Sequence, residues 1–264
     1  WLRRFSRIGQ VFVTHGEKES SHRFAELIAQ ELKVPVVVPK LDESFELKGA
    51  QALSTWDTSY REFSVEEDFA GVCQVTRRAE IQYRGAFGLA QRRFKIRNNY
   101  YTAFNLGSAR QFFAKLALAR LAEQGKANLP QAAEDWEGEL ERISGEAPWI
   151  VVAREVLAPA QLSSAYYYLD QLPAGAASGY TTTRTGQEVE NIYAILREGL
   201  MPQLFASAPD LTRLWQLLAQ GELLPLPVVE EILAPYWDQR LQVYKIEGKA
   251  PGAQVAFGGT LEEP

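Results

Sequence analysis

The sequence predicts an α/β amino-terminal segment followed by a helix-rich α+β body. Two observations lead to this prediction. A buried strand, an amphipathic helix and a second buried strand follow one another within the first 48 residues, and helical spacing of apolar residues prevails after residue 107. With 264 residues, 46% of them hydrophobic and 23% charged, the chain can form one large or two small globular domains. We expect four regions, at residues 1–48, 49–106, 107–173 and 180–264.

The first region contains two short apolar runs on either side of a helical pattern. The run from Val11 to Thr14 is bounded by glycines and is too short for a helix. Residues 18–33 carry apolar side chains at helical spacing, and residues 34–39 form a second apolar run bracketed by prolines. Strand, helix and strand in this order predict a parallel crossover. Residues just past the first strand, His15 to Glu17, would then face a ligand crevice.

The second region, residues 49–106, is mixed, and its later half combines strand-like alternation with positive charge. Residues 76–97 hold seven cations and one acid, a net charge of +6, whereas the whole chain carries −5. Cations neutralise phosphates, and aromatic rings stack on bases with about 1–3 kcal/mol each. An alternative interpretation is a solvated strand face with its aromatic side chains buried on the other side. The candidate nucleic-acid-binding residues are Arg77, Arg78, Arg84, Arg92, Arg93, Lys95, Arg97, Tyr100 and Tyr101.

The remaining regions are predicted to be mainly helical. Ser108 is suited to cap a helix that stops near Gly125. The tyrosines at 166–168 are interpreted as helix packing, and the glycine- and alanine-rich stretch 173–179 as a boundary loop. Further helices are expected at 130–143, 159–172, 187–198, 210–220 and 228–233, and strands at 241–246 and 254–257.

Cysteine and histidine content restricts the chemistry. The single cysteine, Cys73, excludes an internal disulfide and a multi-cysteine zinc site, and two histidines, His15 and His22, cannot form a histidine-rich metal centre alone. We therefore expect no metal ligand set within this chain. No apolar run is long enough to cross a membrane and no signal peptide is recognisable, so we expect a cytoplasmic protein. Because the chain begins with Trp1, we expect its natural start to lie upstream.

The pattern of apolar strand, His15-Gly16-Glu17, amphipathic helix and second strand resembles the carboxyl-terminal end of the metallo-β-lactamase-fold nucleases of the β-CASP group. The preceding residues 1–5 resemble the short helix before that strand in bacterial members. The resemblance covers residues 1–48. It implies that His15 donates a proton to the leaving oxygen beside a two-zinc centre and that Glu17 orients it. The His-x-His-x-Asp-His motif of the family is missing from these 264 residues. Zinc would therefore need ligands from an upstream segment.

The leading hypothesis is a part of a nucleic-acid-processing protein, derived from a zinc-dependent hydrolase. It would be a metal-dependent phosphodiesterase or nuclease only if another segment completes the site. The expected partners are single-stranded RNA or DNA and a protein segment or subunit that completes the site. We expect no association with a membrane. One alternative is a non-enzymatic helical adaptor or assembly protein. Another is an ADP-ribosyltransferase-like enzyme in residues 180–264, because residues 180–184 and 192–202 resemble an early strand and the following helix of that fold.

Overall fold

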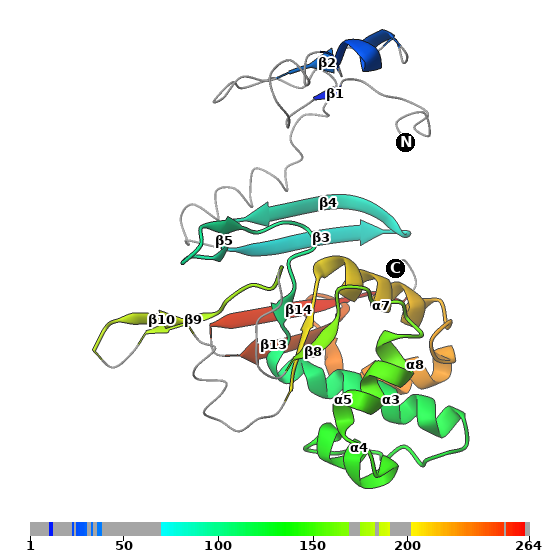
Figure 1. The fold of residues 1–264 in the computed structure, drawn as a ribbon. Helices are drawn as coiled ribbons and strands as arrows, with labels where there is room; N and C mark the ends of the chain where they lie inside the picture. The colour runs from blue at the N-terminus through cyan, green and yellow to red at the C-terminus, as the bar shows by residue number, and fades with distance from the viewer. Residues whose placement is uncertain are drawn as a thin grey trace. The chain divides into compact units, whose positions relative to one another are not determined.

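The chain divides into two compact units in the computed structural model, Trp1–Thr55 and Trp56–Pro264 (Figure 1). The structure describes residues 11–12, 23, 25–30, 33, 36–38, 70–168, 175–182, 185–190, 202–250 and 252–261. Each unit has its own secondary structure. Most of the described residues belong to unit 2.

Unit 1 contains the parallel pair that the order strand, helix, strand predicts. Strand β1 (Val11–Phe12) pairs in parallel with β2 (Val36–Val37), with Val11 opposite Val36. Residues 25–30 between them are helical, and Ala25 and Ile28 are buried there. Leu27 is 57% exposed, so this leucine of the predicted apolar face does not contribute to the core of the unit. His15 and Glu17 lie outside the described residues.

Unit 2 alternates strands and helices along the chain. Its strands are β3 (Gly71–Arg77), β4 (Glu80–Phe87), β5 (Leu89–Gln91), β6 (Ile96–Arg97), β7 (Phe104–Asn105), β8 (Tyr166–Tyr168), β9 (Tyr180–Thr182), β10 (Glu188–Glu190), β11 (Gln203–Ala206), β12 (Trp237–Asp238), β13 (Val243–Ala250) and β14 (Ala253–Gly259). Its helices are η2 (Gly107–Ala109), α3 (Arg110–Glu123), α4 (Trp136–Ser144), α5 (Pro148–Val152), the π-helical turn η3 (Ala153–Leu157), α7 (Ala208–Ala219), α8 (Leu226–Leu233) and η4 (Ala234–Tyr236).

The described strands of unit 2 form small antiparallel sheets. Three of these sheets have two strands each: β3 with β4, β5 with β6, and β9 with β10. Two others have three strands, with β11 between β7 and β8 and β13 between β12 and β14. Helix α7 contacts both β3 and β14. The tight turn of the β3–β4 hairpin lies at Arg78 and Ala79, whereas Gly88, with a φ of 62°, separates β4 from β5.

The core of unit 2 is built around α3. Phe112, Phe113, Leu116 and Leu118 on this helix are at most 1% exposed, and helices α4, α5 and α8 pack against it. The consecutive residues 112–119 of α3 are all buried, so neighbouring elements cover this helix on every side. The ring of Phe112 also meets the ring of Phe257 edge-on at 6.0 Å, which joins α3 to strand β14. The other helices and the β13–β14 hairpin surround α3 in Figure 1.

The predicted fold class is wrong for the body of the chain. Unit 2 is a mixed α/β structure with antiparallel sheets rather than a helix-rich body. The error arises mainly at two places, where residues 166–168 and 188–190 form strands instead of helices. Tyr167 pairs with Leu204 of β11, and aromatic residues are readily accommodated in strands. Tertiary pairing therefore overrides the helical spacing that suggested a helix there.

Helix boundaries were predicted unevenly. Ser108 does not cap α3, because it lies in the 3₁₀ turn η2 and the residue before the helix, Ala109, makes no side-chain cap bond. The helix expected at 210–220 is confirmed as α7, and Ser207 caps it by forming a capping box with Asp210. None of the helices in the described ranges is long and apolar enough to span a membrane.

Candidate functional site

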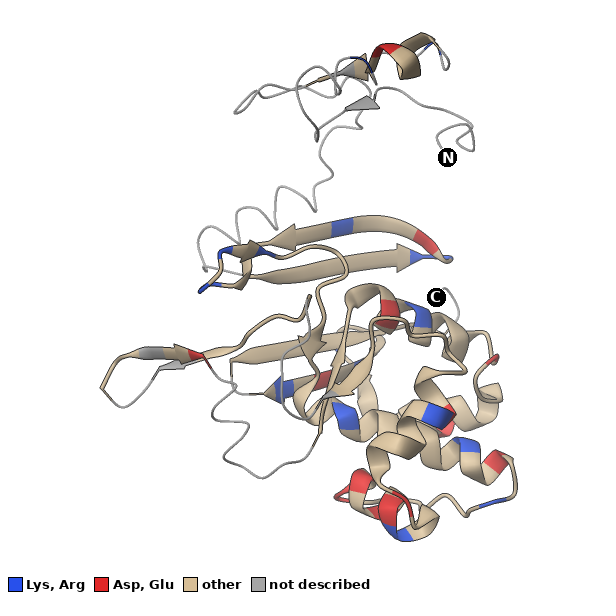
Figure 2. Ribbon diagram, in the orientation of Figure 1, with Lys and Arg blue, Asp and Glu red and all other residues tan. Residues whose placement is uncertain are grey.

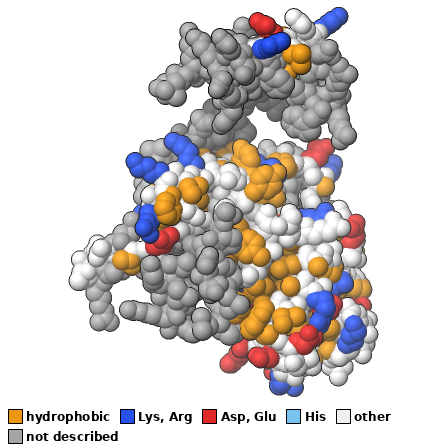
Figure 3. Space-filling view, in the orientation of Figure 1, with side chains coloured by type: hydrophobic (Ala, Val, Ile, Leu, Met, Phe, Trp, Pro, Cys, Tyr) orange, Lys and Arg blue, Asp and Glu red, His pale blue; other side chains and the backbone are white. Residues whose placement is uncertain are grey.

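The basic tip is the segment 92–101, which contains the turn between β5 and β6 and the loop that follows β6. It holds the cations Arg92, Arg93, Lys95 and Arg97 and no acid. All four side chains are exposed. In the ribbon of Figure 2 the Lys and Arg positions cluster at β5 and the turn after it, and the space-filling view in Figure 3 shows Lys and Arg side chains next to hydrophobic ones in the same area. The structure therefore brings four of the seven predicted cations to one end of a hairpin.

Aromatic side chains of the basic tip are exposed to an unusual degree. Phe94 and Tyr101 are each 64% exposed, and Tyr100 is 42% exposed. Large aromatic rings are usually buried, so exposed rings beside cations form the combination that stacks and neutralises a nucleic-acid strand. The loop is locally ordered, because the Tyr101 N–H donates to Asn99 Oδ1 at 2.8 Å and the Asn99 N–H donates to Thr102 Oγ1 at 2.9 Å.

Arg84 of β4 reaches the basic tip but is held by other side chains. Its guanidinium carbon lies 5.3 Å from the centre of the Tyr100 ring, and its Nε donates to Gln74 Oε1 at 2.7 Å. Gln74 in turn donates to Thr212 Oγ1 of α7 at 2.8 Å. These contacts fix Arg84 against the protein surface. Its structural role is therefore to support Tyr100, and it is less free than the tip cations to follow a phosphate.

Arg77 and Arg78 lie at the other end of the β3–β4 hairpin. Gln74 of β3 lies opposite Arg84 of β4. Arg77 is three residues beyond Gln74 in β3, so about 10 Å of strand separates these two residues. Arg77 pairs with Glu80, the one acid of the basic stretch. The predicted set of nine residues is thus divided, with Arg77 and Arg78 apart from the basic tip.

A tyrosine outside the predicted set also belongs to this surface. Tyr180, the first residue of β9, accepts a hydrogen bond on its hydroxyl from the Arg92 N–H at 2.8 Å. The Arg92 guanidinium carbon lies 5.0 Å from the centre of the same ring. Because 88 residues separate the two positions, local sequence patterns gave no signal for this contact.

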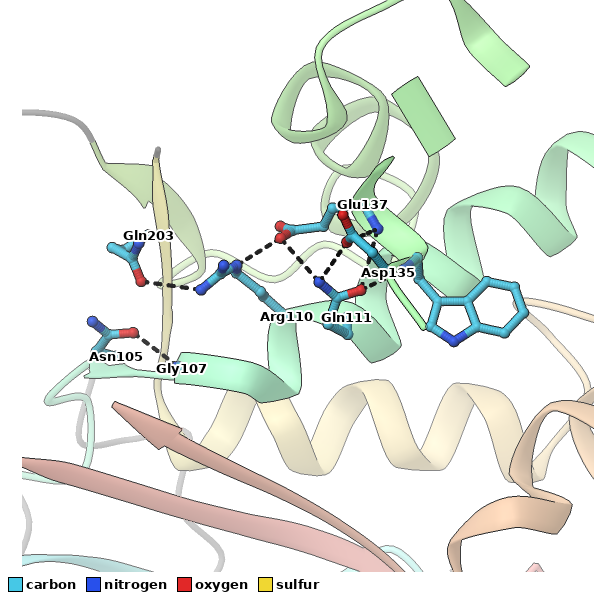
Figure 4. Close-up of polar contacts among 8 residues, drawn as sticks. Asn105, Gly107, Arg110, Gln111, Asp135, Glu137 and Gln203 are labelled. Carbon is cyan, nitrogen blue, oxygen red and sulfur yellow. Dashed lines mark hydrogen bonds and ion pairs between the residues drawn. The ribbon is translucent and has the colours of Figure 1, made fainter. Parts of the chain in front are cut away.

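A second polar cluster lies at the start of α3, where its side chains meet the start of α4 (Figure 4). Gln111 Oε1 accepts from the Trp136 N–H at 2.6 Å, and Gln111 Nε2 donates to Asp135 Oδ1 at 2.9 Å. Arg110 Nε donates to Glu137 Oε2 at 2.7 Å, and a longer contact of 3.4 Å joins Arg110 to Gln203 of β11. These bonds satisfy backbone donors at the start of α4 and fix the two helices to each other.

The electrostatics of this cluster are those of a structural ion pair. Burial raises the pKa of Glu137, which is only 5% exposed, and the hydrogen bond and charge of Arg110 offset part of that effect. The hydrogen bond from Gln111 lowers the pKa of Asp135. All four polar side chains of Arg110, Gln111, Asp135 and Glu137 are engaged with one another. They therefore hold the two helices together and offer no free acid or base.

Ser108 lies directly before this cluster and is exposed. Its Oγ accepts from the Lys249 N–H at 3.2 Å, where β13 approaches so closely that a Cβ at Gly107 would collide with the Lys249 backbone. Within the described ranges, no carboxylate, imidazole or amine is hydrogen-bonded to Ser108 Oγ. The residue three positions later, Gln111, is an amide and cannot accept a proton from the hydroxyl near neutral pH.

Zinc has no fitting site in the part of the chain that the structure describes. Those residues contain no group of three or more His, Cys, Asp and Glu side chains that could hold a metal ion. The full sequence supplies only two histidines and one cysteine.

Comparison with protein families gives one match, at the amino terminus. The family model for the Zn-dependent metallo-hydrolase RNA specificity domain matches residues 1–39. This match is consistent with the resemblance of residues 1–48 to metallo-β-lactamase-fold nucleases. It indicates a metallo-hydrolase family and does not specify the β-CASP group. A comparison with curated proteins gives no match.

Solved structures similar to this chain include two described as penicillin-binding proteins, and FmtA. A penicillin-binding protein from Bacillus halodurans matches with a TM-score of 0.61 at 18% identity, over 75% of this chain and 90% of that one. FmtA from Staphylococcus aureus matches with a TM-score of 0.62 at 14% identity, over 88% and 86%. The octameric penicillin-binding protein homologue from Pyrococcus abyssi matches with a TM-score of 0.57 at 14% identity, over 77% and 65%.

At these identities the similarity defines a fold and no activity. The fold is similar to that of penicillin-binding proteins, in which a Ser-x-x-Lys motif supplies the nucleophile. The sequence contains no Ser-x-x-Lys, and the serine before α3 is followed by Ala109, Arg110 and Gln111. Of the residues that carry the ADP-ribosyltransferase resemblance, 180–182 form strand β9, whereas 183–184 and 192–201 lie outside the described residues.

Proposed function

We propose that this chain is part of a cytoplasmic nucleic-acid-processing protein and that its basic tip binds single-stranded RNA. The observation that carries the proposal is the joint exposure of four cations and three aromatic rings on one ten-residue segment without an acid. On such a surface the cations neutralise the phosphates of a nucleic-acid strand while its bases stack on the aromatic rings. The match of residues 1–39 to an RNA specificity domain supports RNA as the nucleic acid.

Binding rather than catalysis is the activity that unit 2 supports. Its fold resembles that of penicillin-binding proteins. However, no side-chain base of the described residues is bonded to Ser108, and Gln111 is hydrogen-bonded to the start of α4. In unit 1 we propose descent from a zinc-dependent hydrolase of the β-CASP type. The roles of His15 as proton donor and Glu17 as its orienting residue then apply to a protein in which another segment or subunit supplies the zinc ligands.

The proposal is tested by binding of a labelled oligouridine of about 12 nucleotides, followed by fluorescence anisotropy. The triple variant Arg93→Ala, Lys95→Ala, Arg97→Ala removes three exposed cations of the basic tip. Each phosphate contact contributes about 0.7 to the salt slope, so affinity is expected to fall on the order of a hundredfold at about 0.1 M salt. Equal affinity of this variant and the wild type would exclude the basic tip as the binding surface.

A matched control removes the same amount of charge elsewhere. Lys126, Arg142 and Arg240 are exposed cations in other parts of unit 2, and their triple alanine variant is expected to retain wild-type affinity to within about twofold. If both triple variants lose the same affinity, only overall charge matters. Competition with single-stranded DNA and with duplex RNA identifies the preferred nucleic acid, and absence of binding to all of them favours a protein partner instead.

A further inference from the structure

Tyr180 contacts the first residue of the β5–β6 turn in two ways. Its hydroxyl oxygen accepts from the Arg92 N–H at 2.8 Å, and its ring carries the Arg92 guanidinium at 5.0 Å from the ring centre. One side chain therefore binds both the backbone and the side chain of the same residue. This double contact fixes the point at which the chain leaves β5 and enters the turn.

The turn itself needs external support. Its backbone is closed by the Lys95 N–H, which donates to the Arg92 carbonyl at 3.2 Å, and Lys95 has a φ of 54°. A left-handed conformation is unfavourable for a residue other than glycine. All four turn residues are exposed, and β5 and β6 are joined by only two residue pairs. A two-stranded hairpin of this size is not stable alone in water.

The segment that leads to Tyr180 supplies this support. It runs along β5, where the Ser178 N–H donates to the Ala90 carbonyl at 2.8 Å and Gln91 Nε2 donates to the Ala176 carbonyl at 3.1 Å. Tyr180 is fixed in turn, since it pairs with Glu190 of β10, and a Cβ at Gly252 would collide with the Tyr180 backbone. The support of the basic tip is therefore a segment held by hydrogen bonds to β5 and by close packing against Gly252.

We infer that Tyr180 is a positioning residue for nucleic-acid binding by the basic tip, an inference that rests on the proposed function. Tyr180 keeps Arg92 on its ring and holds the turn so that Arg93, Lys95 and Arg97 face a bound strand. A binding surface held in its bound conformation loses less conformational entropy when the ligand binds. Removal of Tyr180 is therefore expected to weaken binding without removal of any phosphate contact.

The first test needs no nucleic acid. Tyr180→Phe removes the hydroxyl that accepts from Arg92 and keeps the ring. Amide hydrogen exchange of Arg92 is expected to become about fivefold faster in this variant, in line with the loss of one hydrogen bond. Tyr236→Phe removes a hydroxyl from η4 and is expected to leave this exchange rate unchanged. Equal exchange of the Arg92 amide in wild type and Tyr180→Phe would overturn the inference.

The second test measures oligouridine binding by Tyr180→Ala, with thermal melting as a control for folding. Affinity is expected to fall about tenfold, while the slope of log affinity against log salt stays that of the wild type, because every cation remains. A changed slope would show that Tyr180 acts through phosphate contacts, and unchanged affinity would show that it has no part in binding; either result overturns the inference. If the wild type itself binds no oligonucleotide, the proposed function fails, and the role of Tyr180 fails with it.

Discussion

The Arg84 guanidinium lies over the ring of Tyr100, with 5.3 Å between its carbon and the ring centre, although the two residues come from different strands and loops. The same guanidinium donates to Gln74. Arg84 carries the positive charge that could bind a phosphate, but its guanidinium already contacts Tyr100 and Gln74 of the same chain. The exposed cations of the basic tip differ from it in this respect, and the difference can be measured.

Arg84 and Arg97 are expected to affect nucleic-acid binding differently. Arg97→Ala removes an exposed cation and should reduce the magnitude of the salt slope by about 0.7. Arg84→Ala removes the support of Tyr100 and should weaken binding a few-fold at an unchanged slope, because stacking is weakened but no phosphate contact is lost. The measurement is oligouridine affinity at several salt concentrations. Equal reductions of the slope by both variants would contradict the structural role of Arg84.

The tight turn of the β3–β4 hairpin is expected to be improved by glycine. Arg78 and Ala79 have φ values of 52° and 62°, the left-handed region that favours glycine. Ala79→Gly should raise the free energy of unfolding by about 1 kcal/mol, since relief of the left-handed alanine outweighs the extra entropy of glycine in the unfolded chain. Ala86→Gly, within β4, is the matched control and should lower it by about 0.5–1 kcal/mol. Chemical denaturation measures both, and destabilisation by Ala79→Gly would contradict the turn geometry.

Gln111 is expected to contribute to stability through the start of α4. Gln111→Ala leaves the Trp136 N–H and Asp135 without their partner, which should lower the free energy of unfolding by about 1–2 kcal/mol. Gln220→Ala, at an exposed position just past α7, should change it by less than about 0.5 kcal/mol. Urea unfolding measures both variants. Equal stability of Gln111→Ala and the wild type would show that the cluster between α3 and α4 is not stabilising.

Ser108 is expected to resist acylation by penicillin. The hydroxyl accepts from the Lys249 N–H, no side-chain base of the described residues is bonded to it, and the third residue after it is an amide. Incubation with a fluorescently labelled penicillin, followed by gel electrophoresis and mass spectrometry, should show no covalent adduct. An adduct on Ser108 that Ser108→Ala abolishes would contradict a binding role for unit 2 and support acyl transfer.

Tyr166 is expected to make stability fall at alkaline pH. Burial raises the pKa of Tyr166 from 10.0 to about 12. Because the unfolded chain releases this proton first, the contribution is fully present below pH 10 and is lost as the pH rises toward about 12. Urea unfolding across this range should show a smaller decline for Tyr166→Phe than for the wild type. The same decline in both would exclude Tyr166 as a cause.

Some elements of the fold could be predicted because their signals are local. Helix α7 has a capping box at Ser207 and Asp210 and a glycine after its end, and β13 and β14 alternate in their apolar residues. The strand at Tyr166–Tyr168 could not be separated from a helix by pattern alone, because it is short and its partner, β11, lies far away in the sequence.

The sequence predicted which residue types form the candidate site, but not how those residues are arranged in space. Counting charges identified the cations of the basic tip, and their exposure agrees with a solvated surface. Charge counting could not separate Arg77 and Arg78 from the rest, since the hairpin register decides that separation. It also could not find Tyr180, whose contact with Arg92 depends on how the segment 175–180 lies along β5.

The salt dependence of single-stranded RNA binding by the wild-type chain tests the central claim most directly. Of the four exposed cations, Arg92 is held over the Tyr180 ring, so Arg93, Lys95 and Arg97 predict a slope of log affinity against log salt of about −2 for an oligouridine. The same experiment with duplex RNA should give weaker binding, because paired bases cannot stack on Phe94 and Tyr101. Absent binding, or a slope near zero, would contradict the account.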